Sequence, residues 1–240
     1  MKIYFITGTS KGIGYNIALS LLKDSSSLVY GLSRTNTIEH ENFTHVKIDL
    51  SDIERVNNFG FKVKDKVEKI VLINNAGIIG DIKQTGKVSN KSIIDTYNVN
   101  SIAPSMLINK FIAQFQNIEV DKIILNISSG AGRHTISSWA SYCASKSAID
   151  MYSQVVYDEQ KRIQRKKSVK IYSIAPGIVD TPMQEVIRSA KLEDFKFVNQ
   201  FIDYKEKSQL ISPSDIAEKL ISFLNHSNKY KNVIYDLREL

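Results

Sequence analysis

The sequence of 240 residues predicts an α/β fold, in which one doubly wound parallel sheet lies between two layers of helices. Short runs of β-forming residues alternate along the chain with stretches that repeat apolar residues at helical spacing. The run Ile70–Ile73 is apolar throughout, as expected for a strand that is covered on both faces. The sequence contains no linker or internal repeat. We therefore expect one three-layer domain over residues 1–240.

The composition limits the possible functions. Apolar residues make up 42% of the chain, which suffices for a sizeable core. The single cysteine, Cys143, excludes an internal disulfide and a zinc cluster and indicates a reducing cytoplasm, so we expect no metal site. No apolar stretch approaches the ~20 residues of a membrane helix, and we expect no membrane contact. The net charge is +7, but its densest run, residues 161–167, predicts a solvated helix end rather than a nucleic-acid site.

The first predicted strand, Lys2–Ile6, leads directly into a glycine-rich turn and then into a helical pattern over residues 13–22. The glycines follow the spacing Gly-x-x-x-Gly-x-Gly. Such a turn lets the backbone approach a pyrophosphate, which the positive N-terminus of the helix attracts. Strand, turn and helix in this order predict a dinucleotide site of the Rossmann type. The residues expected to contact the cofactor here are Gly8, Ser10, Lys11, Gly12, Ile13 and Gly14.

A second strand, Leu28–Leu32, ends in Ser33 and Arg34. Enzymes that prefer NAD usually carry an acidic residue at this place, where it holds the ribose 2′-hydroxyl. Here a serine precedes a guanidinium that can grip a 2′-phosphate bidentately, and Lys11 adds a second positive charge. We therefore predict NADP(H) rather than NAD(H) as the cofactor. The alternative is two unrelated surface cations.

Two further strands end where a nucleotide would lie. The strand Val46–Leu50 contains Asp49, which could accept a hydrogen bond from the adenine amino group or serve as a plain helix cap, and Ser51-Asp52 could also cap the next helix. The strand Ile70–Ile73 leads into small residues that let backbone lie against a sugar or base. Ligands of doubly wound sheets bind at the carboxyl ends of the strands. We expect cofactor contacts from Asp49, Leu50, Asn75, Ala76 and Gly77.

The second half of the chain carries residues that suit catalysis. Ser128 and Ser129 leave the strand Ile123–Ile127 where a hydroxyl can meet a substrate carbonyl. Tyr142 and Lys146 are four residues apart in a helical stretch, so both lie on one face. A cation about 4 Å away would lower the pKa of a phenol by roughly three units, which predicts a Tyr142 pKa near 7. An isolated Tyr-x-x-x-Lys is more often a surface pair.

The remaining elements complete the alternation of strands and helices. The helical pattern of residues 91–115 contains Asn100, which fits neither its polar nor its apolar side. Val169–Ile174 is a strand, and the loop 175–181 follows it. Residues 182–207 are helical, charged and aromatic. A helix begins near Ser212 with a proline in its first turn, and Val233–Tyr235 forms a last strand.

Six motifs occur in a fixed order, and their spacing identifies a family. They are Thr7-Gly8-x-x-x-Gly12-x-Gly14, Asn74-Asn75-Ala76-Gly77, Asn100, Ser129, Tyr142-x-x-x-Lys146 and Pro176-Gly177. Together they resemble the short-chain dehydrogenase/reductase family over nearly the whole chain. Residues 120–122, 127–132, 179–184 and 187–189 are similar to segments of bacterial benzil reductases and sepiapterin-reductase-like enzymes.

The resemblance implies roles for the catalytic residues. It selects Ser129 over Ser128, because the family's serine lies thirteen positions before its tyrosine. Tyr142 would protonate the carbonyl oxygen, and Ser129 would hydrogen-bond that oxygen as charge develops. Lys146 would lower the pKa of the phenol and hold the nicotinamide ribose. Asn100 would hold a water that links Lys146 to solvent, and the alternative is a buried asparagine that kinks its helix.

The resemblance also implies further contacts. Residues 182–207 would form a mobile substrate lid. The helices around residues 91–115 and 139–162 would join subunits into a homodimer or homotetramer. Backbone and side chain of the loop after the sixth strand would meet the carboxamide through Pro176, Gly177, Ile178, Val179 and Thr181. Candidates to line the substrate pocket are Ala131, Trp139 and Met183.

The sequence thus predicts a cytoplasmic, NADPH-dependent carbonyl reductase that converts a small ketone or α-diketone to an alcohol or hydroxyketone. Two alternatives remain. A 3-oxoacyl-thioester reductase would use the same cofactor, and the positive charge would suit an acidic carrier protein. A non-catalytic NADP(H)-sensing protein would share the fold, but the presence of Asn100, Ser129, Tyr142 and Lys146 argues against it.

Overall fold

The computed structural model describes residues 1–63, 66–164 and 166–240, which build one parallel sheet. Seven strands pair in the order β3-β2-β1-β4-β5-β6-β7. The first three strands are added toward one edge of the sheet and the last four toward the other, so the point at which the order reverses lies between β1 and β4. This order confirms the predicted doubly wound topology. The strands are β1 (Lys2–Thr7), β2 (Ser27–Ser33), β3 (Phe43–Lys47), β4 (Lys69–Asn74), β5 (Asp121–Ile127), β6 (Lys170–Ala175) and β7 (Ile234–Asp236).

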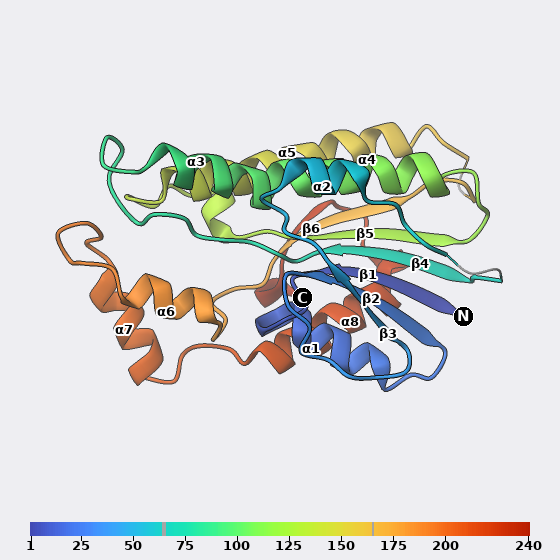
Figure 1. The fold of residues 1–240 in the computed structure, drawn as a ribbon, viewed down its shortest axis with the longest axis horizontal. Helices are drawn as coiled ribbons and strands as arrows, with labels where there is room; N and C mark the ends of the chain where they lie inside the picture. The colour runs from blue at the N-terminus through green and yellow to red at the C-terminus, as the bar shows by residue number, and fades with distance from the viewer. Residues whose placement is uncertain (64–65, 165) are drawn as a thin grey trace.

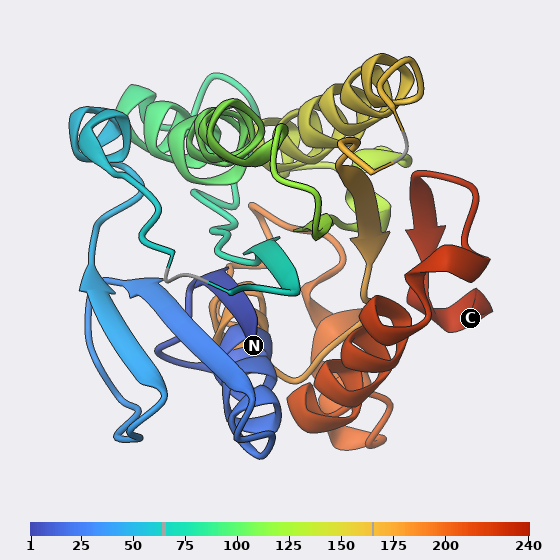
Figure 2. The ribbon, with the colours of Figure 1, turned by 90° about the vertical axis from the view of Figure 1, so that its right-hand side faces the viewer.

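Helices cover both faces of the sheet and confirm the three-layer architecture (Figure 1). One layer holds α1 (Gly12–Leu22) and α8 (Pro213–Asn225), which pack against each other. The opposite layer holds α2 (Ile53–Asn58), α3 (Asn90–Tyr97), α4 (Ala103–Phe115) and α5 (Ala140–Gln160). The edge-on view in Figure 2 separates the two layers. Short 3₁₀ turns occupy Gly130–Gly132, Ser227–Lys229 and Leu237–Glu239.

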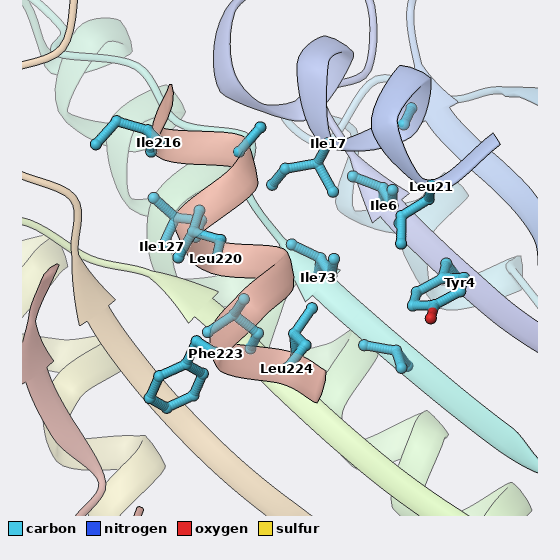
Figure 3. Close-up of a cluster of buried hydrophobic side chains, with 14 of the residues drawn as sticks. Tyr4, Ile6, Ile17, Leu21, Ile73, Ile127, Ile216, Leu220, Phe223 and Leu224 are labelled. Carbon is cyan, nitrogen blue, oxygen red and sulfur yellow. The ribbon is translucent and has the colours of Figure 1, made fainter. Parts of the chain in front are cut away.

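Each face of the sheet has its own apolar core, because successive strand residues point to opposite sides. Tyr4 and Ile6 pack toward α1 and α8, whereas Ile3 and Phe5 pack toward the opposite layer. Figure 3 shows the first core, in which Leu220 of α8 lies fully buried over the strands. Burying one such side chain contributes roughly 1.5–3 kcal/mol. The two cores hold the strand ends in fixed positions beneath the site described below.

Three predicted elements differ from the structure. The third strand ends at Lys47 instead of reaching Leu50, because its partner β2 ends at Ser33, the residue in register with Lys47. The predicted helix over residues 91–115 contains a π-helical segment at Asn98–Ile102 between α3 and α4. The stretch 182–207 forms two helices, α6 (Pro182–Arg188) and α7 (Val198–Glu206), instead of one.

The helices α6 and α7 lie beyond the carboxyl ends of the strands, at one end of the molecule (Figure 1). They share an apolar cluster in which Trp139 of the β5–α5 segment packs with Phe195 of the segment between α6 and α7. α6 and α7 therefore border the carboxyl ends of the strands, where doubly wound folds bind their ligands. Within the described ranges, no helix has the length and apolarity to cross a membrane.

Candidate active site

A cavity of about 890 Å³ extends along the carboxyl ends of the strands. Its size falls in the range of small-molecule and cofactor pockets. Every residue that the sequence predicted to contact cofactor or substrate lines this cavity, except Gly14, which lies behind the glycine-rich turn. Of the predicted catalytic residues, Ser129, Tyr142 and Lys146 line it, whereas Asn100 is buried behind its wall. The structure thus brings together residues that are up to about 170 positions apart in the chain.

Thr7 and Asn75 hold the glycine-rich turn in place. The Thr7 hydroxyl accepts hydrogen bonds from the backbone amides of Asn75 and Ala76, at 2.9 and 3.0 Å. In return, Asn75 Nδ2 donates to the carbonyl oxygens of Thr7 and Gly8. These bonds tie the end of β1 to the segment that follows β4. The turn is therefore braced from below by its neighbouring strand.

The turn has the shape that a pyrophosphate requires. Gly8 and Gly12 adopt positive φ angles of 74° and 65°, which favour glycine. A Cβ at Gly14 would lie 2.3 Å from Asn75 Nδ2, so only glycine fits there. Among the described residues, no side chain caps α1, and its first amide groups are available for an anion. This geometry fits the dinucleotide that the sequence predicts.

The end of the cavity that is predicted to hold the adenosine carries two cations. Arg34 and Lys11 are exposed, line the cavity, and form no ion pair with any described residue. Asp49 accepts hydrogen bonds from the amide and hydroxyl of Ser51, at 3.0 and 2.8 Å. Asp52, not Asp49, caps α2 by accepting from the Arg55 amide, which rules out the helix-cap alternative for Asp49. One Asp49 oxygen is engaged in this turn, and an adenine contact for Asp49 stays a prediction.

Tyr142, Ser129 and Lys146 converge on the opposite end of the cavity. Tyr142 and Lys146 both lie on the buried face of α5, and the Lys146 amine is 5.8 Å from the centre of the tyrosine ring. Lys146 Nζ donates to the carbonyl oxygen of Ile127 at 2.8 Å. Ser129 hydrogen-bonds the Tyr142 phenol, whereas Ser128 Oγ is buried without a partner in the described part of the chain. Ser129, and not Ser128, is thus the serine that faces the phenol.

The predicted lowering of the Tyr142 pKa is wrong for this structure. Burial raises the pKa of Tyr142 to about 12, and the hydrogen bond with Ser129 only partly offsets this. Burial also lowers the pKa of Lys146 to about 8, against the pull of the Asp150 charge. Desolvation is the largest cause of both shifts, and neither group is among the causes that shift the pKa of the other. Tyr142 is consequently a protonated phenol at neutral pH and suits the role of proton donor.

Asn100 sits in the π-helical segment and fixes the chain beside the site. Its side chain donates to the carbonyl oxygen of Ile78 and to Ser145 Oγ, and its Oδ1 accepts from the amide of Ile78. Both polar atoms of the side chain are thereby engaged. The structure supports the alternative of a buried asparagine at a helix irregularity, a feature that is frequent at functional sites. The predicted water-holding role is not tested by these contacts.

The substrate end of the cavity is aromatic. Trp139 stacks on Phe195 with ring centres 5.4 Å apart and meets the edge of Tyr142 at 5.7 Å. Ala131 and Met183 also line this end, together with Phe201 of α7. Phe195 itself is fully buried core, as such aromatic spacing often indicates. The aromatic stretch after residue 182 therefore contributes both to the core and to the wall of the cavity.

Several residues of the cavity wall were absent from the sequence prediction. Asp236 and Arg238, at the end of β7, form a bidentate ion pair with distances of 2.8 and 2.6 Å, and both line the cavity. The rule that ligands meet the carboxyl ends of strands could have pointed to them. His134 and Gln184 also line the cavity, and no signal in the sequence singles them out.

Comparison with known proteins shows the relatives of this chain. The family model described as short chain dehydrogenase matches residues 2–192. A benzil reductase ((S)-benzoin forming) of Bacillus subtilis is 36% identical over 246 residues, which cover 100% of this chain and 99% of that protein. A sepiapterin reductase of Xenopus tropicalis is 30% identical over 168 residues, 69% of this chain and 61% of its own length.

Solved structures show the same fold. A short-chain dehydrogenase/reductase of Saccharomyces cerevisiae superposes with a TM-score of 0.84 at 23% identity, covering 99% of this chain and 96% of that one. The members of this family are oxidoreductases that use a nicotinamide cofactor. The match of the family model, the identity to curated relatives and the shared sheet topology lead to one conclusion: this chain belongs to the short-chain dehydrogenase/reductase family.

Proposed function

We propose that this protein is an NADPH-dependent carbonyl reductase that reduces one carbonyl of a small ketone or α-diketone. The convergence of Ser129, Tyr142 and Lys146 on the aromatic end of one cavity is the observation that carries this proposal. The similarity to benzil reductases supports a diketone substrate with aromatic groups. The single cysteine supports a cytoplasmic location.

Each catalytic residue has a separate role in the proposed reaction. The hydride for the carbonyl carbon would come from a reduced nicotinamide held along the cavity. Tyr142 gives its proton to the carbonyl oxygen, because its high pKa keeps it protonated at neutral pH. Ser129 hydrogen-bonds the same oxygen while negative charge develops on it. Lys146, protonated below about pH 8, stabilises the phenolate that remains.

The preference for NADPH follows from charge at the other end of the cavity. Arg34 and Lys11 present two exposed cations, and Asp49, in the segment after β3, is already hydrogen-bonded to Ser51. A 2′-phosphate gains charge-assisted hydrogen bonds there, whereas a bare 2′-hydroxyl gains none of comparable strength. We infer that the loop 175–181 holds the carboxamide and that α6 and α7 form the substrate lid.

The substrate is tested by consumption of NADPH with three compounds: benzil, 1-phenyl-1,2-propanedione and an acetoacetyl thioester. We expect fast turnover of the two diketones and slow turnover of the thioester. Preference for the thioester would favour the alternative 3-oxoacyl-thioester reductase, which the net charge of +7 suits through attraction to an acidic carrier. Tight NADPH binding without turnover of any of the three would contradict the reductase proposal and favour an NADP(H)-sensing protein.

A further inference from the structure

The helix that carries Tyr142 and Lys146 places a third ionisable group on the same buried face. Asp150 follows Lys146 by four residues on α5, and its side chain is only 8% exposed. Residues at this spacing have Cβ atoms roughly 5–6 Å apart. Buried carboxylates are rare unless paired, because removal from water disfavours the charge. The proposed reaction as described so far gives this group no role.

The Asp150 carboxylate touches two segments outside its own helix. Oδ1 accepts a hydrogen bond of 2.6 Å from the Ser173 hydroxyl on β6. Oδ2 faces Arg133 Nε at 3.6 Å but has no hydrogen-bond partner among the described residues. Arg133 in turn donates to the carbonyl oxygen of Tyr235 on β7. The carboxylate therefore connects α5, β6 and the segment that follows β5.

Gly132 brings that segment against the helix. A Cβ on Gly132 would lie 3.0 Å from the carbonyl carbon of Lys146 and 3.2 Å from Asp150 Oδ2. A side chain at this position would require these neighbours to shift by a few tenths of an ångström. Gly132 ends the short turn that begins directly after Ser129. The turn that follows Ser129 is thus packed directly against Lys146 and Asp150 through Gly132.

We propose that Asp150 is a positioning residue, whose buried negative charge keeps Lys146 a cation and whose contact with Arg133 fixes the turn carrying Ser129. Lys146 does not depend on a direct ion pair, since its amine donates to Ile127. The carboxylate acts on it through a buried environment, where screening by water is weak. The consequence for catalysis rests on the proposed reductase function, because only there does a cationic Lys146 stabilise a phenolate.

The titratable and charged groups around Lys146 and Asp150 determine in which direction each substitution shifts the pKa of Lys146. On α5 they are Tyr142, Lys146 and Asp150, with Asp150 the charge that raises the pKa of Lys146. The segment after β5 adds the cation of Arg133. From the C-terminal segment, Asp236 lies within the field of Arg133 and is paired with Arg238. From β6 only the neutral Ser173 hydroxyl faces the carboxylate.

The test is a direct titration of Lys146 by NMR of protein labelled with 13C at the lysine ε-carbon, the signal being assigned with Lys146→Met. Asp150→Asn keeps the shape of the side chain and removes its charge. We expect it to lower the Lys146 midpoint by about one pH unit. Ser173→Ala is the matched control, because it removes the hydrogen bond and leaves the charge, and the midpoint should stay at the wild-type value.

Arg133→Gln should shift the Lys146 midpoint in the direction opposite to that of Asp150→Asn. Removal of that cation should raise the Lys146 midpoint, and this result decides the question should Asp150→Asn fail to fold. Equal midpoints in wild type, Asp150→Asn and Arg133→Gln would overturn the proposal. In turnover of a diketone, the basic limb of kcat/KM should move together with the midpoints. A protein that titrates as expected but reduces no carbonyl would contradict the proposed function and leave the role of Asp150 toward Lys146 intact.

Discussion

At the scale of single residues, we expect Arg34 to determine the choice of cofactor. Its guanidinium is exposed at the cavity and forms no ion pair among the described residues, although its charge, after the hydrogen bonds from Ser51, helps to lower the pKa of Asp49 against the effect of burial. Replacement by alanine should raise KM for NADPH about 10- to 100-fold, the value of a charge-assisted hydrogen bond, and leave KM for NADH unchanged. Lys23→Ala, at the far end of α1, is the matched control and should alter neither. Equal losses with both cofactors would exclude Arg34 from contact with the 2′-phosphate.

We expect Lys146 to set the pH dependence of reduction. Its pKa is lowered to about 8 by burial, so the amine is a cation below that pH and loses its charge as the pH rises through it. Tyr142, whose pKa burial raises to about 12, stays protonated over the same range. We therefore expect kcat/KM to be level below pH 7 and to fall above pH 8 in a pH–rate series. A rate that rises from pH 7 to pH 10 would show that the phenolate, not the phenol, is the active form.

At the scale of elements, α5 and the π-helical segment before α4 present apolar side chains to solvent. Met151 and Val155, one turn apart on α5, are 60% and 51% exposed, and Ile102, the last residue of the π-helical segment, is 42% exposed. An exposed face of this kind is typical of subunit interfaces. We propose that it joins two or four copies of the chain, as the sequence predicts for these helices.

Disruption of that face should change the mass of the assembly. Met151→Glu combined with Val155→Glu should convert the oligomer to monomer in sedimentation, because two buried charges would lack partners in the interface. Leu19→Glu on α1, which is 38% exposed, is the control and should keep the wild-type mass. A wild-type protein that sediments as a monomer would refute the proposed interface.

At the scale of the whole molecule, the fold could be predicted closely because its signals are local. Apolar runs such as Ile70–Ile73 mark strands, and the glycine-rich turn after β1 marks the first βα unit. The end of β3 at Lys47 could not be predicted, because it depends on where the partner strand stops. The π-helical segment at Asn98–Ile102 likewise arises from tertiary contacts of Asn100.

The candidate site likewise has features that could be predicted from the sequence and features that could not. Residues that belong to spaced motifs, such as Tyr142 and Lys146, could be placed from the sequence. Their pKa values could not, because burial depends on the whole fold and reverses the shift that the pair alone predicts for Tyr142. Nor could Asp150 be connected with Arg133, since the ion pair joins α5 to a turn that folds back on it.

The most direct test of the proposed reductase is the rate of NADPH-dependent benzil reduction by Tyr142→Phe, measured beside wild type and together with NADPH binding. The substitution removes only the phenolic hydroxyl, and loss of a general acid costs roughly 10²- to 10⁴-fold in rate. We predict unchanged NADPH affinity and less than a tenth of the wild-type rate. Retention of more than a tenth of that rate, in a protein that still binds NADPH, would contradict Tyr142 as the proton donor.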